Sequence, residues 1–173
     1  MMYTASKYDK CAWAIRYPRG RATGMDYPEG FKSMEIGKGQ QLREGDEIAI
    51  LSFGPFGNYV MEAADELAED GINVGHYNMR FAKPLDTDLI DEICHNYERI
   101  ITIEDGTKLG GFGSAVTEYL GDKPHHIPTT IMGVPDRIVE HGTQEELHLE
   151  VNLDPQGIKE KVRDVLKSHS VKT

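Results

Sequence analysis

Glu47-Ile-Ala-Ile-Leu-Ser-Phe53 decides the fold, because this stretch is apolar at nearly every position and a turn follows it. Strands that are buried on both faces of a parallel sheet have such short apolar runs. Four apolar residues then recur at helical spacing: Val60, Ala63, Ala64 and Leu67. A buried strand followed by an amphipathic helix, here over residues 59–69, predicts the first unit of an α/β fold.

The same alternation continues along the chain. The sequence predicts strands at residues 72–77, 99–104 and 129–132, and helices at 85–97, 114–120 and 158–166. Leu85, Leu89 and Ile93 are expected on the buried face of the second helix. Thr143-Gln-Glu-Glu146 has the pattern of a capping box, which opens a short helix.

An antiparallel strand is expected at the start of the sheet. Residues 36–43 alternate weakly and meet the strand at residues 47–53 across the turn Glu44-Gly45-Asp46, which predicts a hairpin. Right-handed crossovers join the remaining strands as parallel neighbours. The sequence therefore predicts a three-layer α/β/α fold with a five-stranded, mostly parallel sheet and one antiparallel edge strand.

A separate segment precedes this unit. Residues 1–8 have the character of the last turns of a helix, and residues 11–17 that of a strand. A lone helix and strand cannot bury their apolar faces unaided, so residues 1–20 are expected to be the tail of another domain. Residues 21–35 are predicted to be a linker and residues 36–173 the main domain.

The composition excludes several classes of protein. The 173 residues carry a formal charge of −10, which argues against a general nucleic-acid role because phosphate backbones require clustered Lys and Arg. No apolar stretch is long enough to span a bilayer, and we expect a cytoplasmic protein without membrane contact. Cys11 and Cys94 have no metal-binding spacing and are expected to be inert thiols.

The glycine-rich turn Gly106–Gly113 follows a predicted strand and precedes a predicted helix. Phosphates bind at such places in α/β folds, because free backbone N–H groups and the helix dipole attract anions. The spacing nevertheless matches neither nucleotide-binding fingerprint, and Glu104 and Asp105 would repel an anion. A tight turn that uses glycine for close approach is the favoured interpretation.

The histidines do not indicate a catalytic or metal site. His125-His126 lies between prolines without a visible third ligand, and His141 is expected in a loop before the capping box. No nucleophile–base arrangement or paired carboxylates stand out. The sequence thus predicts no catalytic, cofactor-binding or metal-ligating residue within this chain.

Ile15-Arg-Tyr-Pro-Arg-Gly20 is the best candidate for a contact with substrate. Pro18 stiffens the backbone, so Arg19 is presented from a fixed turn, and Arg16 points to one face of its expected strand. Guanidinium groups bind phosphate through a bidentate fork. The alternative from the residues alone is a surface pair of arginines in weak salt bridges.

Several motifs carry a family resemblance along nearly the whole chain. They are Ala14-Ile-Arg-Tyr-Pro-Arg-Gly20, Glu35-Ile-Gly-Lys-Gly39, Met79-Arg-Phe-Ala-Lys-Pro-Leu-Asp86, Gly110-Gly-Phe-Gly-Ser114, Gly133-Val-Pro-Asp136 and Gly142-Thr-Gln-Glu-Glu146. In this order they resemble the C-terminal part of the 1-deoxy-D-xylulose-5-phosphate synthase family. Some are shared with transketolase-like enzymes in general, and the first and last favour the synthase.

The resemblance implies a transketolase-like C-terminal domain from a homodimeric, three-domain enzyme. That family uses thiamine diphosphate and Mg²⁺ to condense pyruvate with glyceraldehyde 3-phosphate, with loss of CO₂, for isoprenoid, thiamine and pyridoxal biosynthesis. The Gly-Asp-Gly segment that holds the diphosphate is not found here, and neither is the catalytic glutamate of the middle domain. The chain is therefore expected to be a piece of the enzyme that binds no cofactor and is inactive alone.

The resemblance also implies a role for the arginines. An arginine at the end of the middle, pyrimidine-binding domain helps to bind the substrate phosphate, and Arg16 and Arg19 are both candidates. Arg19 lines up with the transketolase position, and Arg16 fits the synthase. The alternative function is a free-standing interaction module, or a subunit of a split transketolase or 2-oxoacid-dehydrogenase-like enzyme. The helix at residues 1–8 argues against that alternative, because a natural half is expected to begin at a domain boundary.

Overall fold

The structure, a computed structural model, describes residues 1–18, 30–124 and 127–170, and the side chains as far as Ser168. Its helices are α1 Met2–Ser6, α2 Gly57–Glu69, α3 Thr87–Asn96, α4 Phe112–Gly121, α5 Gln144–Glu150 and α6 Pro155–Ser170, with a 3-10 turn, η1, at Gly54–Phe56. Its strands are β1 Gln40–Arg43, β2 Ile48–Phe53, β3 Val74–Asn78, β4 Arg99–Thr107 and β5 Thr129–Val134.

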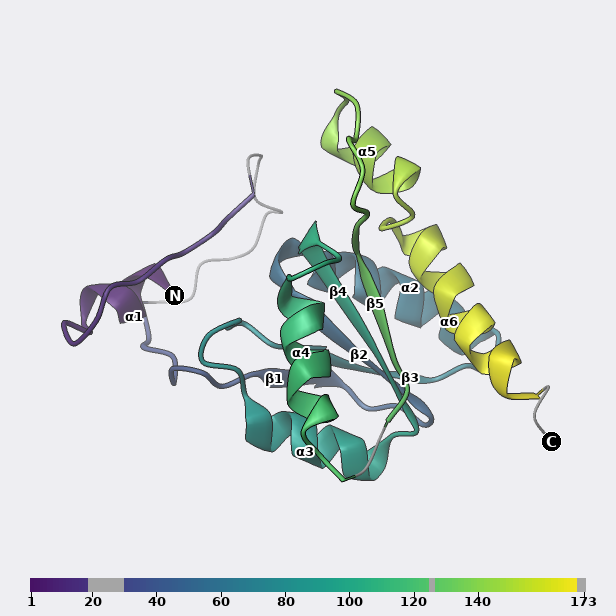
Figure 1. Cartoon of the computed structure of the whole chain (residues 1–173), viewed down its shortest axis with the longest axis horizontal. Helices are drawn as coiled ribbons and strands as arrows, with labels where there is room; N and C mark the ends of the chain where they lie inside the picture. Colours follow the sequence, from purple (N-terminus) through teal and green to yellow (C-terminus); the bar gives the residue numbers. More distant parts are fainter. Residues whose placement is uncertain (19–29, 125–126, 171–173) are drawn as a thin grey trace.

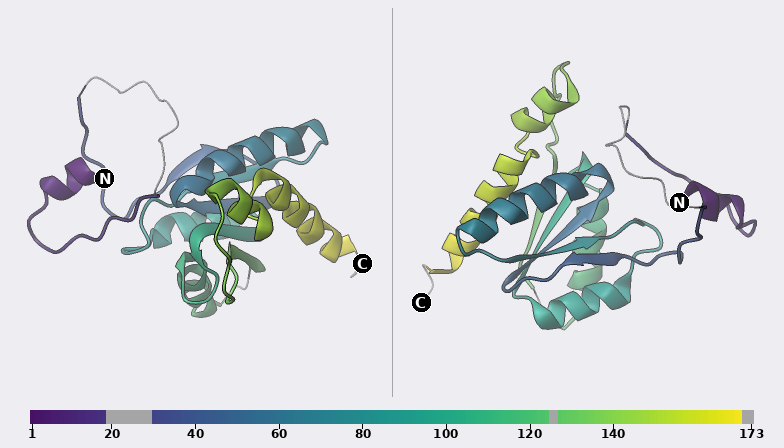
Figure 2. Two further views of the ribbon diagram at one scale, coloured as in Figure 1. Left: turned by 90° about the horizontal axis from the view of Figure 1, so that it is seen from above. Right: turned by 180° about the vertical axis from the view of Figure 1, so that it is seen from behind.

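The strands form one twisted sheet in the order β1-β3-β2-β4-β5, in which only β1 is antiparallel to its neighbour (Figure 1). Helices α2 and α6 cover one face of the sheet, and α3 and α4 cover the other (Figure 2). The predicted three-layer α/β/α fold, with a mostly parallel five-stranded sheet and one antiparallel edge, is confirmed.

Strand β2 lies at the centre of the core. Ile48 and Ile50 face α2 and α6, and Ala49 and Leu51 face α3 and α4. All four are at most 1% exposed, as the apolar run at residues 47–53 predicts. Burying a large aliphatic side chain stabilises the fold by about 1.5–3 kcal/mol, so this short strand contributes to both halves of the core.

The predicted hairpin between residues 36–43 and β2 is wrong. Strand β1 pairs with β3 instead, with Gln40 opposite Asn78, while β2 has β3 and β4 as its two neighbours. The chain after β1 passes the start of β3 so closely that a Cβ on Gly45 would overlap the main-chain nitrogen of Gly75. The short turn therefore crosses β3 and places β1 and β2 on opposite sides of it.

The helices form where their periodicity predicts them. In α2 the buried residues are the predicted four, Val60, Ala63, Ala64 and Leu67. In α3 the buried face is centred on Ile90 and Ile93, whereas Leu85 precedes the helix and is only partly buried together with Leu89. The capping box of α5 is present as predicted, and α6 packs along α2.

The N-terminal segment packs beside the sheet without joining it. Helix α1 is present, but the strand predicted at residues 11–17 is not, because no strand lies beside this segment to pair with it in the described part of the chain. In Figure 1 the segment lies on the side of the molecule opposite α6. Arg19, and most of the stretch predicted to be a linker, lie outside the described residues.

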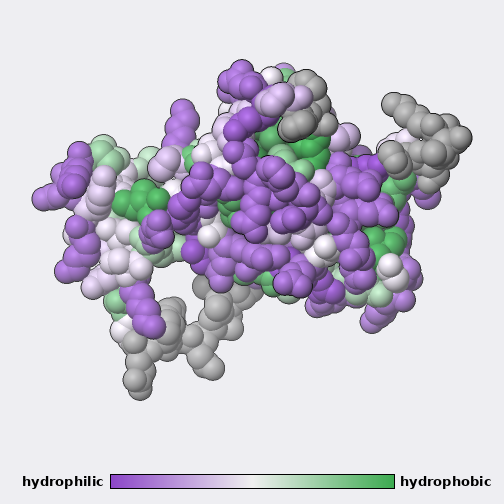
Figure 3. All heavy atoms as spheres, turned by 90° about the horizontal axis from the view of Figure 1, so that it is seen from below, coloured by the Kyte–Doolittle hydropathy of each residue, from purple (hydrophilic) through white to green (hydrophobic). Residues whose placement is uncertain are grey.

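The surface agrees with the acidic composition. Seen from below, the molecule is mainly hydrophilic, and apolar side chains appear in small separate patches (Figure 3). Within the described ranges, no helix has the length and apolar character needed to cross a membrane.

Candidate functional site

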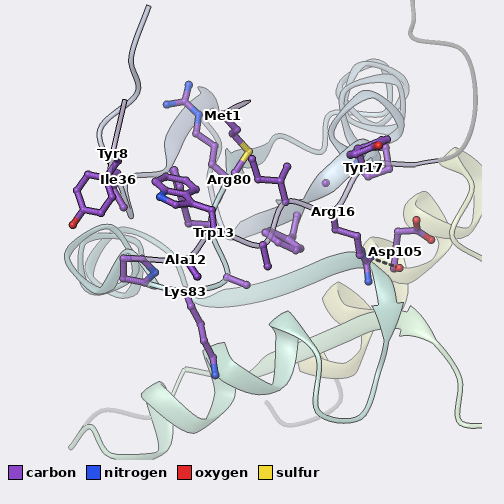
Figure 4. A pocket seen from close by; sticks show the side chains of 18 of the residues that line it. Met1, Tyr8, Ala12, Trp13, Arg16, Tyr17, Ile36, Arg80, Lys83 and Asp105 are labelled. Carbon is purple, nitrogen blue, oxygen red and sulfur yellow. Dashed lines mark hydrogen bonds between the residues drawn. The ribbon is translucent and has the colours of Figure 1, made fainter. Parts of the chain in front are cut away.

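A pocket of about 590 Å³ lies between the N-terminal segment and the carboxyl ends of β2, β3 and β4 (Figure 4). From the segment it is lined by Met1, Tyr8, Cys11, Ala12, Trp13, Ala14, Ile15, Arg16, Tyr17 and Pro18. From the domain it is lined by Ile36, Phe53, Gly54, Pro55, Arg80, Phe81, Ala82, Lys83, Pro84 and Asp105.

The strand order explains why a pocket forms there. The chain leaves β2 toward β3 on one side and later returns to β4 on the other side, so the order reverses between β2 and β4. In open α/β sheets ligands bind outside the carboxyl ends of the strands at such a switch point. Phe53 and Glu104, the last residues paired between β2 and β4, mark this place.

Arg16 reaches the switch point from the N-terminal segment. Its guanidinium donates a hydrogen bond to the main-chain carbonyl of Asp105, and its side chain remains exposed. Arg16 forms no ion pair with any described residue. Two more cations line the pocket, Arg80 and Lys83, but Figure 4 shows them pointing away from Arg16.

Aromatic side chains form the wall beside Arg16. The Trp13 ring packs edge-on against Phe81 and Tyr8, with centroid distances of 6.2 and 6.0 Å. The indole Nε1 of Trp13 is buried and has no hydrogen-bond partner among the described residues. These contacts hold residues 8–16 against the loop that follows β3.

The glycine-rich turn adjoins the pocket but is filled by the protein itself. The side chain of Glu104 is 4% exposed, and its Oε1 accepts a hydrogen bond from the main-chain N–H of Gly113 in the first turn of α4, at 2.9 Å. A Cβ on Gly106 or Gly111 would overlap the carboxylate oxygens of Glu104. The internal carboxylate thus takes the place that an anion would occupy, and the prediction of a structural turn agrees with this geometry.

The sequence comparisons identify the family of this domain. Residues 37–158 match the model of the transketolase C-terminal domain. The chain belongs to this family.

Several similar curated proteins are 1-deoxy-D-xylulose-5-phosphate synthases. That of Cytophaga hutchinsonii is 44% identical over 95% of this chain and 26% of its own length, and that of Aquifex aeolicus is 41% identical over 96% of this chain and 26% of its own length. The chain thus spans about a quarter of the length of these relatives, and the match extends to residues that precede the C-terminal domain. The resemblance to the C-terminal part of the synthase is confirmed.

Solved structures support the same fold. A chain described as a split gene transketolase, inactive beta4 tetramer, superposes with a TM-score of 0.71 and 30% identity, covering 81% of this chain and 46% of that one. The transketolase mutant R525L of Pichia stipitis superposes with a TM-score of 0.56 over 74% of this chain and 18% of that one. At 16% identity the second match shows the fold alone.

Two of the family motifs meet in this transketolase C-terminal domain. The carboxylate of Asp86 caps α3 through the N–H of Leu89 at 3.3 Å and accepts from the N–H of Gly39 at 2.8 Å. Lys38 bridges Asp86 and the exposed Asp88, at 3.2 and 2.8 Å. These motif residues therefore fix the loop that follows β3, which forms part of the pocket wall.

The described residues do not fit a bound Mg²⁺–diphosphate group. No group of three or more His, Cys, Asp or Glu within them is placed to hold a metal ion. The glycine-rich turn at the N-terminus of α4 is filled by the carboxylate of Glu104. His125 and His126 lie outside the described residues, and His141 is exposed in the loop before α5.

The sequence did not predict one buried pair of polar side chains. Ser52 of β2 and His76 of β3, both fully buried, share a hydrogen bond of 2.8 Å between Oγ and Nε2, and His76 Nδ1 has no partner in the described chain. Burial, assisted by the nearby charge of Arg43, lowers the pKa of His76 to about 4. The imidazole is therefore neutral at pH 7 and stabilises the sheet as an uncharged group. Only the place of His76 within a predicted strand, between Val74-Gly75 and Tyr77, could have indicated its burial.

Proposed function

We propose that this chain forms the C-terminal part of a 1-deoxy-D-xylulose-5-phosphate synthase, the thiamine-diphosphate-dependent enzyme that joins pyruvate and glyceraldehyde 3-phosphate with loss of CO₂. The observation that carries the proposal is the extent of the match. Because it covers 95% of the chain, it includes the segment around Arg16 as well as the transketolase C-terminal domain.

Within that enzyme, Arg16 is a contact for the phosphate of glyceraldehyde 3-phosphate. The position of its guanidinium at the sheet's switch point supports this role, since a charge-assisted hydrogen bond to phosphate contributes about 1.5–3 kcal/mol. The contact to the Asp105 carbonyl orients the guanidinium and leaves its other N–H groups available. Arg19, three residues further on, is the second candidate for the same phosphate.

The remaining parts of the active centre come from other domains and from a second copy in a cytoplasmic homodimer. Thiamine diphosphate and Mg²⁺ are held there. The C-terminal domain contributes the pocket wall and the loops that orient Arg16. The chain by itself is expected to be inactive.

The test compares the chain with a full-length enzyme that carries it. The full-length enzyme should form 1-deoxy-D-xylulose 5-phosphate and CO₂ from pyruvate and glyceraldehyde 3-phosphate, and the isolated chain should form neither. Calorimetry of the isolated chain at micromolar concentration with thiamine diphosphate and Mg²⁺ should show no binding heat. Cofactor binding or turnover by the isolated chain contradicts the proposed division of roles.

A second candidate is a subunit of a split transketolase-like enzyme, or a free-standing interaction module. It is favoured by the similarity to the split gene transketolase chain, at 30% identity. Substrates separate the candidates, because a transketolase transfers a two-carbon unit from a ketose phosphate whereas the synthase consumes pyruvate. A full-length or reconstituted enzyme that uses only the ketose donor supports the second candidate.

A further inference from the structure

The end of β4 has an unusual geometry next to Arg16. Strand β4 pairs regularly with β5 from Ile100 to Ile103, and the register then shifts before Thr107 pairs with Val134. The peptide group between Asp105 and Gly106 lies within this irregular stretch. Regular pairing with β5 therefore does not account for the position of the Asp105 carbonyl.

The carboxylate of Glu104 lies against this peptide. A Cβ on Gly106 would overlap its Oε2, so the carboxylate packs directly on the main chain of residue 106. The same carboxylate is tied to α4 through the N–H of Gly113, at 2.9 Å. Because Glu104 is 4% exposed, water scarcely competes for this contact, and the N-terminal dipole of α4 favours the negative charge.

We infer that Glu104 is a positioning residue for Arg16: its buried carboxylate fills the glycine-rich turn and holds the Asp105 carbonyl where the Arg16 guanidinium binds it. The interaction runs from α4 through Glu104 and the peptide at Asp105 to Arg16. This inference rests on the proposed function, because it concerns how the substrate-phosphate contact is oriented. It gives a buried acidic residue a role in binding an anionic substrate that it does not touch.

The isolated chain allows a first test without catalysis. Trp13 is the single tryptophan, and it packs on Phe81 beside Arg16, so its emission reports how the N-terminal segment is docked. Arg16→Ala and Glu104→Ala should each shift the emission to the red and increase acrylamide quenching. The double variant should add little to either single change, because both remove the same contact.

Two matched variants separate positioning from folding. Glu104→Gln keeps an acceptor oxygen for the N–H of Gly113, so its Trp13 emission should resemble that of the native chain. Glu118→Ala removes an exposed carboxylate from α4, the helix that contains Gly113, and should leave the Trp13 emission unchanged. Circular dichroism and thermal unfolding check that each variant is folded. If Glu104→Ala does not fold, Glu104→Asp replaces it, since the shorter side chain keeps the charge but loses reach.

The full-length enzyme allows the second test. Glu104→Ala should raise KM for glyceraldehyde 3-phosphate by roughly 3- to 30-fold, as expected for residues in one hydrogen-bond network, with KM for pyruvate nearly unchanged. Glu104→Gln should restore most of the loss. In the Arg16→Ala background, Glu104→Ala should have little further effect on KM.

The outcomes distinguish this inference from the proposed function. If Arg16→Ala raises KM for the phosphorylated substrate but Glu104→Ala leaves it and the Trp13 emission unchanged, the positioning role is wrong and the proposed function stands. Equal losses for both substrates would make Glu104 a structural residue only. If Arg16→Ala itself has no effect on KM, the proposed phosphate contact fails instead.

Discussion

The guanidinium of Arg16 donates a hydrogen bond to the main-chain carbonyl of Asp105, and so joins the N-terminal segment to the carboxyl end of β4 across 89 positions of sequence. The contact lies at the switch point of the sheet, in the wall of the 590 Å³ pocket. An arginine anchored to a carbonyl keeps its positive charge uncompensated. This charge is what the proposed contact with a substrate phosphate requires.

The buried imidazole of His76 should make stability depend on pH. Its pKa is about 4 in the folded chain and near 6.5 when unfolded, so the unfolded state binds more protons between these values. The contribution of His76 to the free energy of unfolding is complete above pH 7 and decreases as the pH falls toward 4. Between pH 7 and 5 the free energy of unfolding should fall by roughly 2 kcal/mol. Urea unfolding at both pH values measures it.

His76→Gln should reduce this pH dependence, and His141→Gln, at an exposed loop position, should retain it. An unchanged pH dependence in His76→Gln would show that another group titrates.

A side chain at Gly45, in the turn that joins β1 to β2 across β3, should destabilise the fold. Gly45→Ala places a Cβ against the main chain of Gly75, and backbone cannot move aside as a flexible side chain can. We expect a loss of about 1–3 kcal/mol in the free energy of unfolding, as for overpacking of a core. Gly121→Ala at the end of α4, where a Cβ meets no atom within 4 Å, should be neutral or slightly stabilising. Similar values for both variants would contradict the close crossing.

The carboxylate of Asp86 should contribute much more than its neighbour Asp88. Asp86→Ala leaves the N–H groups of Gly39 and Leu89 without their acceptor, which should cost about 2–4 kcal/mol. Asp88→Ala loses only an exposed ion pair with Lys38 and should change stability by less than about 1 kcal/mol. Denaturant unfolding of the two variants measures the difference, and equal losses would refute this assignment.

Helix α5 should depend on its cap, because none of its residues is buried. Thr143→Ala removes the hydroxyl that accepts from the N–H of Glu146 and donates to its carboxylate, and should weaken the helix by about 1 kcal/mol. Hydrogen exchange of the α5 amides should accelerate while exchange in β2 stays constant. Gln144→Ala, at the next exposed position, is the control. Unchanged protection of α5 in Thr143→Ala would mean that other contacts hold this helix.

The order of strands and helices could be predicted because the spacing of apolar residues within each segment indicates a strand or a helix. The run at residues 47–53 and the stripe from Val60 to Leu67 each indicate their own burial. The partner of β1 could not be predicted in this way. Adjacency in sequence favours β2, but both edges of β2 are taken by parallel neighbours, and β3 offers the free edge.

The candidate site was predictable only in part. The chemistry of guanidinium groups indicated Arg16, but its partner is a carbonyl, which every residue has. Glu104 was expected to repel an anion from the glycine-rich turn, whereas its carboxylate fills the turn itself. Side-chain direction at the end of an irregular strand decides such roles, and spacing along the sequence does not encode it.

Steady-state kinetics of Arg16→Ala in the full-length enzyme tests the central claim most directly. If Arg16 binds the substrate phosphate, KM for glyceraldehyde 3-phosphate should rise by about 10-fold or more, the loss of one charge-assisted contact, while KM for pyruvate stays within about twofold. An equal rise for both substrates, or no rise for the phosphorylated one, would contradict the account.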